Sequence, residues 1–260
     1  MGVKRDAIIK TAAMLVIGDE ILSGRTQDVN VSHVAKTLTL IGIDLLEARI
    51  VADNAQAIVS AVRELSKLYD YVFTSGGIGP THDDITADAI AQAFNVEIDH
   101  DPRAIALLEA HYANSNLELN SARLRMARIP IGAELIPNPV SSAPGFQLHN
   151  VYVMAGVPRI FQAMMSEVLP TLESGDRIES RTIDAGLPEG QIANQLGEIQ
   201  LQHAGTMIGS YPYVDGTNIS TRIVIRSRDI TALSQAVVDV EQMITELNIK
   251  IPIQGCENHD

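Results

Sequence analysis

Over the first two thirds of the chain, short runs of apolar residues alternate with segments whose apolar residues recur at helical spacing. The runs predict strands over residues 12–17, 43–51, 71–74, 133–136 and 151–155. The spaced patterns predict helices over residues 31–41, 58–68, 86–94, 102–111, 118–127 and 158–172. Units of this kind, repeated along a chain, are typical of an α/β fold with a mostly parallel sheet and helices on both faces.

The pattern changes after residues 173–176. Residues 181–183 are expected to be extended and residues 189–203 helical, while residues 206–214 and 220–227 alternate around a hairpin-type turn at Asp215-Gly216. A long helix is expected over residues 230–247. We therefore expect an α/β domain over residues 1–174 and a small α+β domain over residues 175–260.

Loops of small and polar residues follow several of the predicted strands. They cover residues 18–24, 75–86 and 156–159, and a fourth loop rich in Gly, Pro and Ser covers residues 138–145. Loops that leave the carboxyl ends of parallel strands converge on one edge of the sheet, where ligands bind. The loops therefore predict one composite pocket.

The loop SGGIGPTHDDIT, residues 75–86, carries the strongest chemical signal. Its glycines permit a positive φ and a close approach of a ligand, and N–H groups at a strand-to-helix turn bind phosphate. Asp83 and Asp84 would repel such an anion unless a divalent cation bridged them to it. The loop therefore indicates a phosphorylated ligand with a metal ion; the alternative is a tight turn in which Asp84 caps the following helix.

Composition narrows the choice of partners. The 260 residues are 46% apolar and carry a net charge of −13, which argues against nonspecific binding to nucleic acid or anionic membranes. Cys256 is the single cysteine, and no cysteine–histidine cluster has zinc spacing. No apolar run approaches the roughly 20 residues of a membrane span, and residues 1–11 lack an apolar signal core. The expected location is the cytoplasm.

Four motifs, GDEILSG, GGIGPTHDDIT, NPVSSAPG and AGVPR, occur in this order. With them, residues 12–172 resemble the molybdopterin-binding domain of the competence/damage-inducible protein A (CinA) family, and the remainder resembles the small KH-like domain that follows it there. The resemblance implies a three-layer α/β/α domain, shared with enzymes of molybdenum-cofactor synthesis. It also implies metal-dependent hydrolysis of the pyrophosphate in ADP-ribose or a related dinucleotide such as FAD. Longer members add a C-terminal amidase domain, which we do not expect here.

The chain departs from the family's usual motifs in three places. Ser141 and Ser142 stand where the third loop commonly has Gly and Thr, and Ala155 stands where the fourth commonly has Pro. Ile160 stands where the family commonly has Glu. Loss of that carboxylate would weaken a metal site or alter a helix start, so it favours a binding role without catalysis.

The resemblance also implies roles for individual residues. Asp84, Asp53 and Glu20 are the expected catalytic carboxylates, and Asp83 and Asp84 the expected metal ligands; for Asp53 and Asp84 the alternative is a helix cap. For Asn30 the alternatives are a bond to a ligand hydroxyl and a cap for the helix that follows. The residues expected to bind the ligand or its phosphates are Gly18, Asp19, Ser23, Asn30, Ser75, Gly76, Gly77, Gly79, Thr81, Thr86, Ser141, Ser142, Gly145, Gly156 and Arg159.

The leading hypothesis is a hydrolase in which Mg, Mn or Co near Asp84 polarises the pyrophosphate while N–H groups of residues 76–79 stabilise the phosphoryl oxygens. The alternatives are a non-catalytic protein that binds molybdopterin or a nucleotide, related to molybdenum-cofactor biosynthesis, and a scaffold with a vestigial pocket. Residues 176–252 contain no GXXG clamp, so no nucleic-acid partner is expected. We expect a homodimer whose last helix packs on its own sheet and leaves Ile230 and Val238 for a partner.

Overall fold

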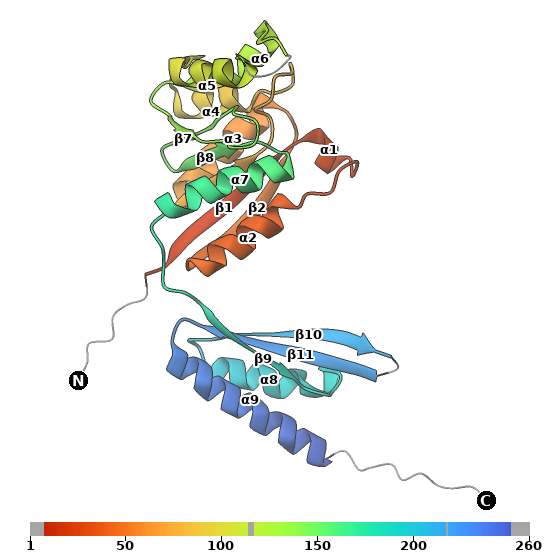
Figure 1. Cartoon of the computed structure of the whole chain (residues 1–260). Helices are drawn as coiled ribbons and strands as arrows, with labels where there is room; N and C mark the ends of the chain where they lie inside the picture. Colours follow the sequence, from red (N-terminus) through yellow and green to blue (C-terminus); the bar gives the residue numbers. More distant parts are fainter. Residues whose placement is uncertain (1–7, 114–116, 217, 251–260) are drawn as a thin grey trace, which may run out of the picture. The chain divides into compact units, whose positions relative to one another are not determined.

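A computed structural model of the chain describes residues 8–113, 117–216 and 218–250. The chain divides into two compact units, Met1–Asp176 and Arg177–Asp260 (Figure 1). Among the described helices, none combines the length and the apolar character that crossing a membrane requires.

The first unit is built on a six-stranded sheet. Its strands, in spatial order, are β2 (Ile43–Val51), β1 (Lys10–Ile17), β3 (Tyr71–Ser75), β8 (Val151–Met154), β7 (Gly145–Leu148) and β6 (Glu134–Ile136). The first four are parallel to one another, and β7 is antiparallel to both β8 and β6. The expectation of a mostly parallel sheet is confirmed. Because Ile17 pairs with Val51 and Ser75 with Met154, the parallel strands end at the same edge.

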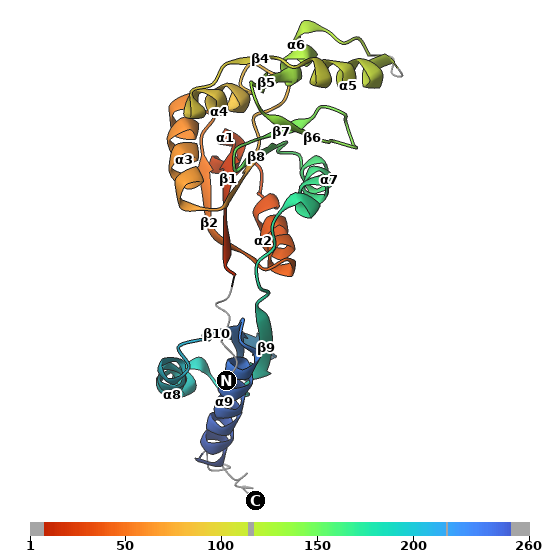
Figure 2. The ribbon, with the colours of Figure 1, turned by 90° about the vertical axis from the view of Figure 1, so that its left-hand side faces the viewer.

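Helices cover both faces of this sheet, as Figure 2 shows. The elements α3 (Ala55–Leu68), α4 (Thr86–Phe94) and α5 (Pro102–Ala113) pack on one face, and α2 (Asn30–Leu40) and α7 (Pro158–Val168) pack on the other. Strand β1 serves both cores: Leu15 points into the first and Met14 into the second, and neither is exposed to solvent. A strand buried on both faces has no polar side, which explains its continuous apolar run.

Smaller elements complete the first unit. They are α1 (Asp19–Leu22), α6 (Ser121–Leu124), the 3-10 turns η1 (Arg125–Ala127) and η2 (Leu169–Thr171), and the antiparallel pair β4 (Ile98–His100) and β5 (Arg128–Pro130). The helix expected over residues 118–127 is wrong in length. Asn120 caps α6 by accepting the N–H of Arg123 at 3.0 Å, so the helix starts late, and it tightens into η1 after one turn.

The second unit has an α+β fold. Strands β9 (Glu179–Asp184), β10 (Met207–Asp215) and β11 (Asn218–Ser227) form an antiparallel sheet in the order β10-β11-β9. Helices α8 (Glu189–Gln202) and α9 (Ile230–Lys250) share one core with side chains of this sheet, among them Ile223 and Ile225. Two residues apart on one strand, these isoleucines lie on the same face, so both helices cover that face.

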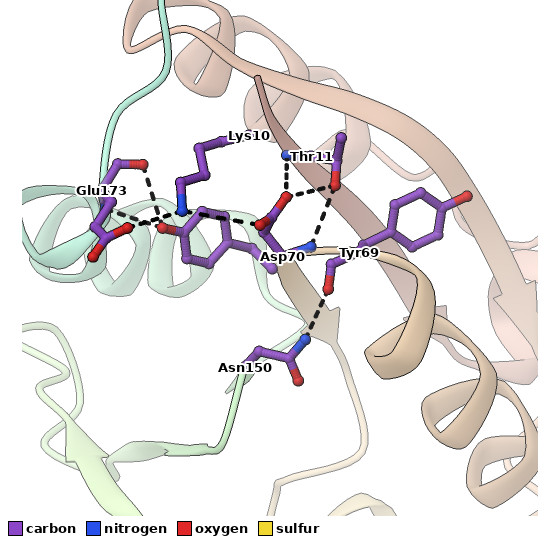
Figure 3. Close-up of polar contacts among 7 residues, drawn as sticks. Lys10, Thr11, Tyr69, Asp70, Asn150 and Glu173 are labelled. Atoms are coloured by element: carbon purple, nitrogen blue, oxygen red, sulfur yellow. Dashed lines mark hydrogen bonds and ion pairs between the residues drawn. The ribbon is translucent and has the colours of Figure 1, made fainter. Parts of the chain in front are cut away.

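A polar cluster closes the amino-terminal edge of the first unit's sheet (Figure 3). Asp70 Oδ2 accepts hydrogen bonds from the backbone N–H and the hydroxyl of Thr11, each at 2.8 Å. Lys10 Nζ lies 2.8 Å from Glu173 and 3.9 Å from Asp70, and Asn150 donates to the carbonyl of Tyr69 at 2.9 Å. The cluster joins the start of β1 to the turns before β3 and β8, at the edge opposite the predicted pocket.

Candidate functional site

The loops that leave β1, β2, β3 and β8 are joined by hydrogen bonds at the carboxyl edge of the sheet. Gly18 N–H donates to the carbonyl of Val51, and Gly76 N–H donates to that of Met154, both at 3.2 Å. A Cβ added to Gly156 would lie 3.2 Å from Gly76 Cα, so these two loops touch through their backbones. The motifs that are separate in sequence therefore form one structure.

Asn30 fastens two of these loops from the first turn of α2. It is only 2% exposed, and its Nδ2 donates to Ser75 Oγ at 2.8 Å and to the Gly156 carbonyl at 2.9 Å. Asn30 Oδ1 is buried without a hydrogen-bond partner among the described residues. The alternative that Asn30 caps α2 is wrong, because Asp28 accepts the N–H of Val31 at 2.9 Å instead.

Gly76 and Gly77 give the loop after β3 its shape. Their φ angles are 110° and 68°, which favour glycine, and a Cβ at either would lie 2.1 Å from Ile17 O or Thr86 Oγ1 respectively. Thr86 is fully buried and donates its hydroxyl to the Gly76 carbonyl and its N–H to the Gly77 carbonyl, each at 3.0 Å. Thr86 thus fixes the backbone of the loop from inside the protein, and its hydroxyl is already engaged by the Gly76 carbonyl.

Only part of the glycine loop offers free N–H groups. Gly76 N–H is used within the sheet by the Met154 carbonyl, so the expectation that it binds phosphate is wrong. The part of the chain that the structure describes supplies no partner to the N–H groups of Gly77, Ile78 and Gly79. Residues 77–79 are therefore the candidate anion cradle.

Asp84 lies beneath this cradle. Its Oδ2 accepts the N–H of Thr81 at 2.8 Å and also the Thr81 hydroxyl, and a Cβ at Gly79 would lie 2.7 Å from the same oxygen. The N-cap residue of α4 is Ile85, so the alternative that Asp84 caps this helix is wrong. Thr81 positions the carboxylate of Asp84 and is itself engaged by it.

Asp53 connects the ends of β1 and β2. Its Oδ2 accepts the N–H of Asp19 at 2.9 Å, while α3 is capped by Asn54, so the cap alternative for Asp53 is also wrong. Burial raises the pKa of Asp53 above its ordinary value, the Asp19 N–H opposes this, and the charges of Asp19, Glu20 and Asp83 raise it further. The charges of three neighbouring carboxylates thus act on Asp53 at this edge.

These carboxylates do not make a complete metal site. Within the described ranges, no three Asp, Glu, His or Cys side chains come close enough together to hold a metal ion. Mg²⁺ is commonly held by one or two protein carboxylates together with substrate phosphates and water. A cation that arrives with a phosphorylated ligand needs fewer protein ligands, and Asp84 and the exposed Asp83 are the candidates.

The loop at residues 138–145 is organised by Asn138. Its Oδ1 accepts the N–H of Ser141 at 3.1 Å, and its Nδ2 donates to Ser141 Oγ at 2.7 Å. Ser142 has a φ of 60° and is half-buried. Gly145 is buried in β7, where a Cβ would lie 2.2 Å from the Val153 carbonyl, so its lack of a side chain serves strand packing. The structure gives Gly145 no place in a phosphate site.

The remaining predicted residues lie at the rim. Ser23 is exposed and donates to the Glu20 carbonyl at 3.3 Å; Arg159 is exposed in the first turn of α7. A Cβ at Gly18 would lie 2.7 Å from the Glu20 carboxylate, which therefore covers that glycine. Ile160 packs against the core beneath α2 and α7, so the position is occupied by an apolar contact.

A cavity opens beside the glycine loop on the side of α4, η1 and β7. Its lining consists of Gly77, Ile78, Gly79, Asp84, Ala87, Asp88, Arg125, Met126, Arg128, Ile129, Pro144 and Phe146. Arg125 and Arg128 were not among the residues predicted from the sequence. The available signal was their spacing of three residues, which places two cations close together in a strongly acidic chain. Arg128 forms an ion pair with Asp88, with N–O distances of 2.6 and 2.9 Å.

Comparison with known proteins places the chain in a family. Residues 13–174 match the model "Probable molybdopterin binding domain", and residues 177–251 match "FAD synthase, middle domain". A protein of Archaeoglobus fulgidus is 31% identical over 90% of this chain and 97% of its own length. A CinA-like protein of Desulfosudis oleivorans is 34% identical over 71% of this chain and 48% of its own length. A probable FAD synthase of Caenorhabditis elegans is 29% identical over 90% of this chain and 50% of its own length.

Among solved structures, the protein CinA with unknown function from Thermoplasma acidophilum is 32% identical and superposes with a TM-score of 0.58, over 63% of this chain and 98% of that one. The chain spans about half the length of the CinA-like and FAD synthase relatives named above. The first family match alone covers more than half of the chain. The chain therefore belongs to the CinA-like family of proteins with a molybdopterin binding domain.

Proposed function

We propose that this protein is a metal-dependent pyrophosphatase that hydrolyses ADP-ribose or a related dinucleotide. The observation that carries the proposal is the position of Asp84 against Gly79, whose N–H, like those of Gly77 and Ile78, has no partner in the described chain. Donors for phosphoryl oxygens and a carboxylate for a cation lie next to each other there. A pyrophosphate needs both, because its negative charge must be neutralised before a nucleophile can approach.

Each residue then has a defined part. The N–H groups of Gly77, Ile78 and Gly79 would bind phosphoryl oxygens, and Asp84 with Asp83 would hold the divalent cation. When bound, that cation neutralises charge on the pyrophosphate and lowers the pKa of a coordinated water. Asp53 is the candidate proton acceptor, because a raised pKa strengthens its carboxylate as a base.

The reaction breaks one P–O bond of the pyrophosphate. A water oxygen forms the new bond to phosphorus, its proton passes toward Asp53, and the bridging oxygen leaves with the other phosphate. ADP-ribose would give AMP and ribose 5-phosphate; FAD would give AMP and FMN. The match of residues 177–251 to a FAD synthase domain supports a dinucleotide containing adenosine, because FAD has that form.

The alternative is a protein that binds molybdopterin or a nucleotide without hydrolysing it. The apolar contact of Ile160, where related chains commonly have a carboxylate, favours this alternative because it removes one possible ligand from the rim of the site. The family match to a molybdopterin binding domain is equally compatible with it.

One screen distinguishes hydrolysis of the ligand from binding alone. The protein is incubated with ADP-ribose, FAD and related dinucleotides, each with Mg²⁺, Mn²⁺ or Co²⁺, and AMP release is followed by chromatography. We expect AMP only in the presence of a divalent cation. Equal turnover in excess chelator would remove the metal from the mechanism. Binding without turnover in every combination would establish the non-catalytic alternative.

A further inference from the structure

Arg125 lines the cavity beside the glycine loop without an ion-pair partner in the described part of the chain. The charged groups lining this cavity are Asp84, Asp88, Arg125 and Arg128. Asp88 and Arg128 neutralise each other in their ion pair, and the Asp84 carboxylate is held by Thr81. In the described part of the chain, no carboxylate lies within ion-pair distance of Arg125. Of the two arginines in the lining, Arg125 is therefore the one whose guanidinium is not already engaged by a carboxylate.

The hydrogen bonds of Arg125 are also incomplete. Its Nε is buried without a partner among the described residues, and its Nη2 reaches only the backbone carbonyl of Asp84, at 3.3 Å. This distance is long for an N–H···O bond. A guanidinium has five N–H donors, and leaving a buried one unpaired is unfavourable. A ligand that supplies several acceptor oxygens would satisfy them.

The groups that line the cavity with Arg125 select the same kind of ligand. Gly77, Ile78 and Gly79 border this cavity, and their N–H groups also lack partners in the described chain. The rest of the lining includes Met126 and Phe146, whose apolar surface excludes water and strengthens charge interactions. The guanidinium of Arg125 and the N–H groups of the glycine loop, with little competing water, favour an anion that presents several acceptor oxygens, as a phosphate group does.

We propose that Arg125 binds an oxygen of a ligand phosphate at this cavity, whose volume of about 20 Å³ admits one water-sized group. The proposal rests on the function proposed above for the same site and identifies the side chain that receives the anion. The contact of Arg125 with the Asp84 backbone places its guanidinium next to the residue whose carboxylate is assigned to the cation. In a pyrophosphate, one phosphate would then contact the guanidinium, and non-bridging oxygens of the other would face the cation, so both phosphates would meet positive charge.

The test measures binding of inorganic pyrophosphate in the presence of Mg²⁺, the cation that would bridge the anion to Asp83 and Asp84, and phosphate release is assayed in parallel to show that the probe is not hydrolysed. Isothermal titration calorimetry compares the wild type with Arg125→Gln, Arg125→Lys and Arg123→Gln. Arg123 is the matched control: it lies two residues away, stacks over Tyr112 at 4.9 Å and does not line the cavity. We expect at least tenfold weaker binding for Arg125→Gln, an intermediate loss for Arg125→Lys, and no change for Arg123→Gln.

A second measurement uses the wild-type chain and needs no folded variant. Phenylglyoxal modifies accessible arginines, and mass spectrometry locates them. Pyrophosphate should protect Arg125 and leave Arg123 unprotected.

Equal affinity of the wild type and Arg125→Gln, or equal modification of Arg125 with and without pyrophosphate, would overturn the proposal. So would an absence of pyrophosphate binding by the wild type. If binding depends on Arg125 and no dinucleotide is hydrolysed, the phosphate site stands and the hydrolase does not. If a dinucleotide is hydrolysed and Arg125→Gln binds pyrophosphate normally, the hydrolase stands and the phosphate site at Arg125 does not.

Discussion

Asp53 and Asp19 are joined by a hydrogen bond of 2.9 Å, from the backbone N–H of Asp19 to the carboxylate of Asp53. The bond connects the ends of neighbouring strands β1 and β2 and holds the Asp53 carboxylate near three others. Burial raises its pKa first, and the charges of Asp19, Glu20 and Asp83 raise it as well. The free site thus contains electrostatic repulsion that a bound cation would relieve.

This repulsion predicts that Asp53→Asn stabilises the protein without ligand. A carboxyl whose folded pKa lies above its unfolded value contributes stability below the unfolded value, and that contribution is lost as pH rises through the folded pKa. The amide keeps an oxygen for the Asp19 N–H and never ionises. We expect a higher Tm for the variant near pH 7 and a difference that shrinks near pH 3. A variant that is less stable than the wild type at neutral pH would contradict the assignment.

A second prediction concerns Asp84→Asn. The amide oxygen can still accept the Thr81 N–H, so the loop should keep its conformation, while the charge required to bind a cation is lost. We expect AMP release to fall about 10²-fold or more with little change in Tm. Asp99→Asn is the control, because that side chain is 81% exposed on β4. A stable variant with full activity would show that Asp84 has a structural role only.

The sequence predicted the layers of the first unit because its strands are buried on both faces and its helices on one. The apolar run of β1 and the spaced residues of α3 and α4 therefore left distinct patterns. The strand β7 was not predicted from the sequence. It has four residues, begins at Gly145 and is buried at three of its four positions, so it shows neither alternation nor length.

Within the site, sequence located the loops but not the role of each side chain. Neighbouring polar residues compete for one cap position, and the local backbone conformation decides between them. Asn54 rather than Asp53 caps α3, and Asp28 rather than Asn30 accepts a backbone N–H in the first turn of α2. Arg125 was missed because it is 41 residues from Asp84 in sequence, and only the packing of η1 brings it to the glycine loop.

A third prediction separates backbone strain from crowding at the glycine loop. Gly77 and Gly132 both have positive φ, 68° and 87°, but a Cβ at Gly132 meets nothing within 4 Å, whereas one at Gly77 lies 2.1 Å from Thr86 Oγ1. Gly132→Ala should cost about 1 kcal/mol from strain alone. Gly77→Ala should cost roughly 1–3 kcal/mol more, because the buried Thr86 must move, and should abolish ligand binding. Chemical denaturation of both variants checks this; equal losses would show that Thr86 adjusts freely.

A fourth prediction concerns the polar cluster at the opposite edge of the sheet. Burial alone would raise the pKa of Asp70, but the hydroxyl and N–H of Thr11 and the charge of Lys10 outweigh it and lower the pKa below 3.8. Stability from a lowered pKa is present above the unfolded value and is lost as pH falls through the folded one. Asp70→Asn should therefore be less stable than the wild type near pH 7 and equally stable in strong acid, with AMP release unchanged. A pH-independent difference in Tm would exclude the charge as its cause.

The last prediction concerns assembly. Helix α9 buries Leu233 and Val240 against its own sheet, with Val237, Ile244 and Leu247 packed beside them, as its apolar spacing predicted. Ile230 and Val238 on the same helix remain 53% and 59% exposed. We expect these two side chains to contact a second copy of the chain, so that the protein is a homodimer and a chain ending at Gly175 is a folded monomer. Light scattering on both chains measures this directly.

Replacing Ile230 and Val238 together by Glu should dissociate the dimer, whereas Leu201→Glu, at a position on α8 that is 83% exposed, should not. A monomeric full-length chain at micromolar concentration, or a shortened chain that remains dimeric, would each refute this contact.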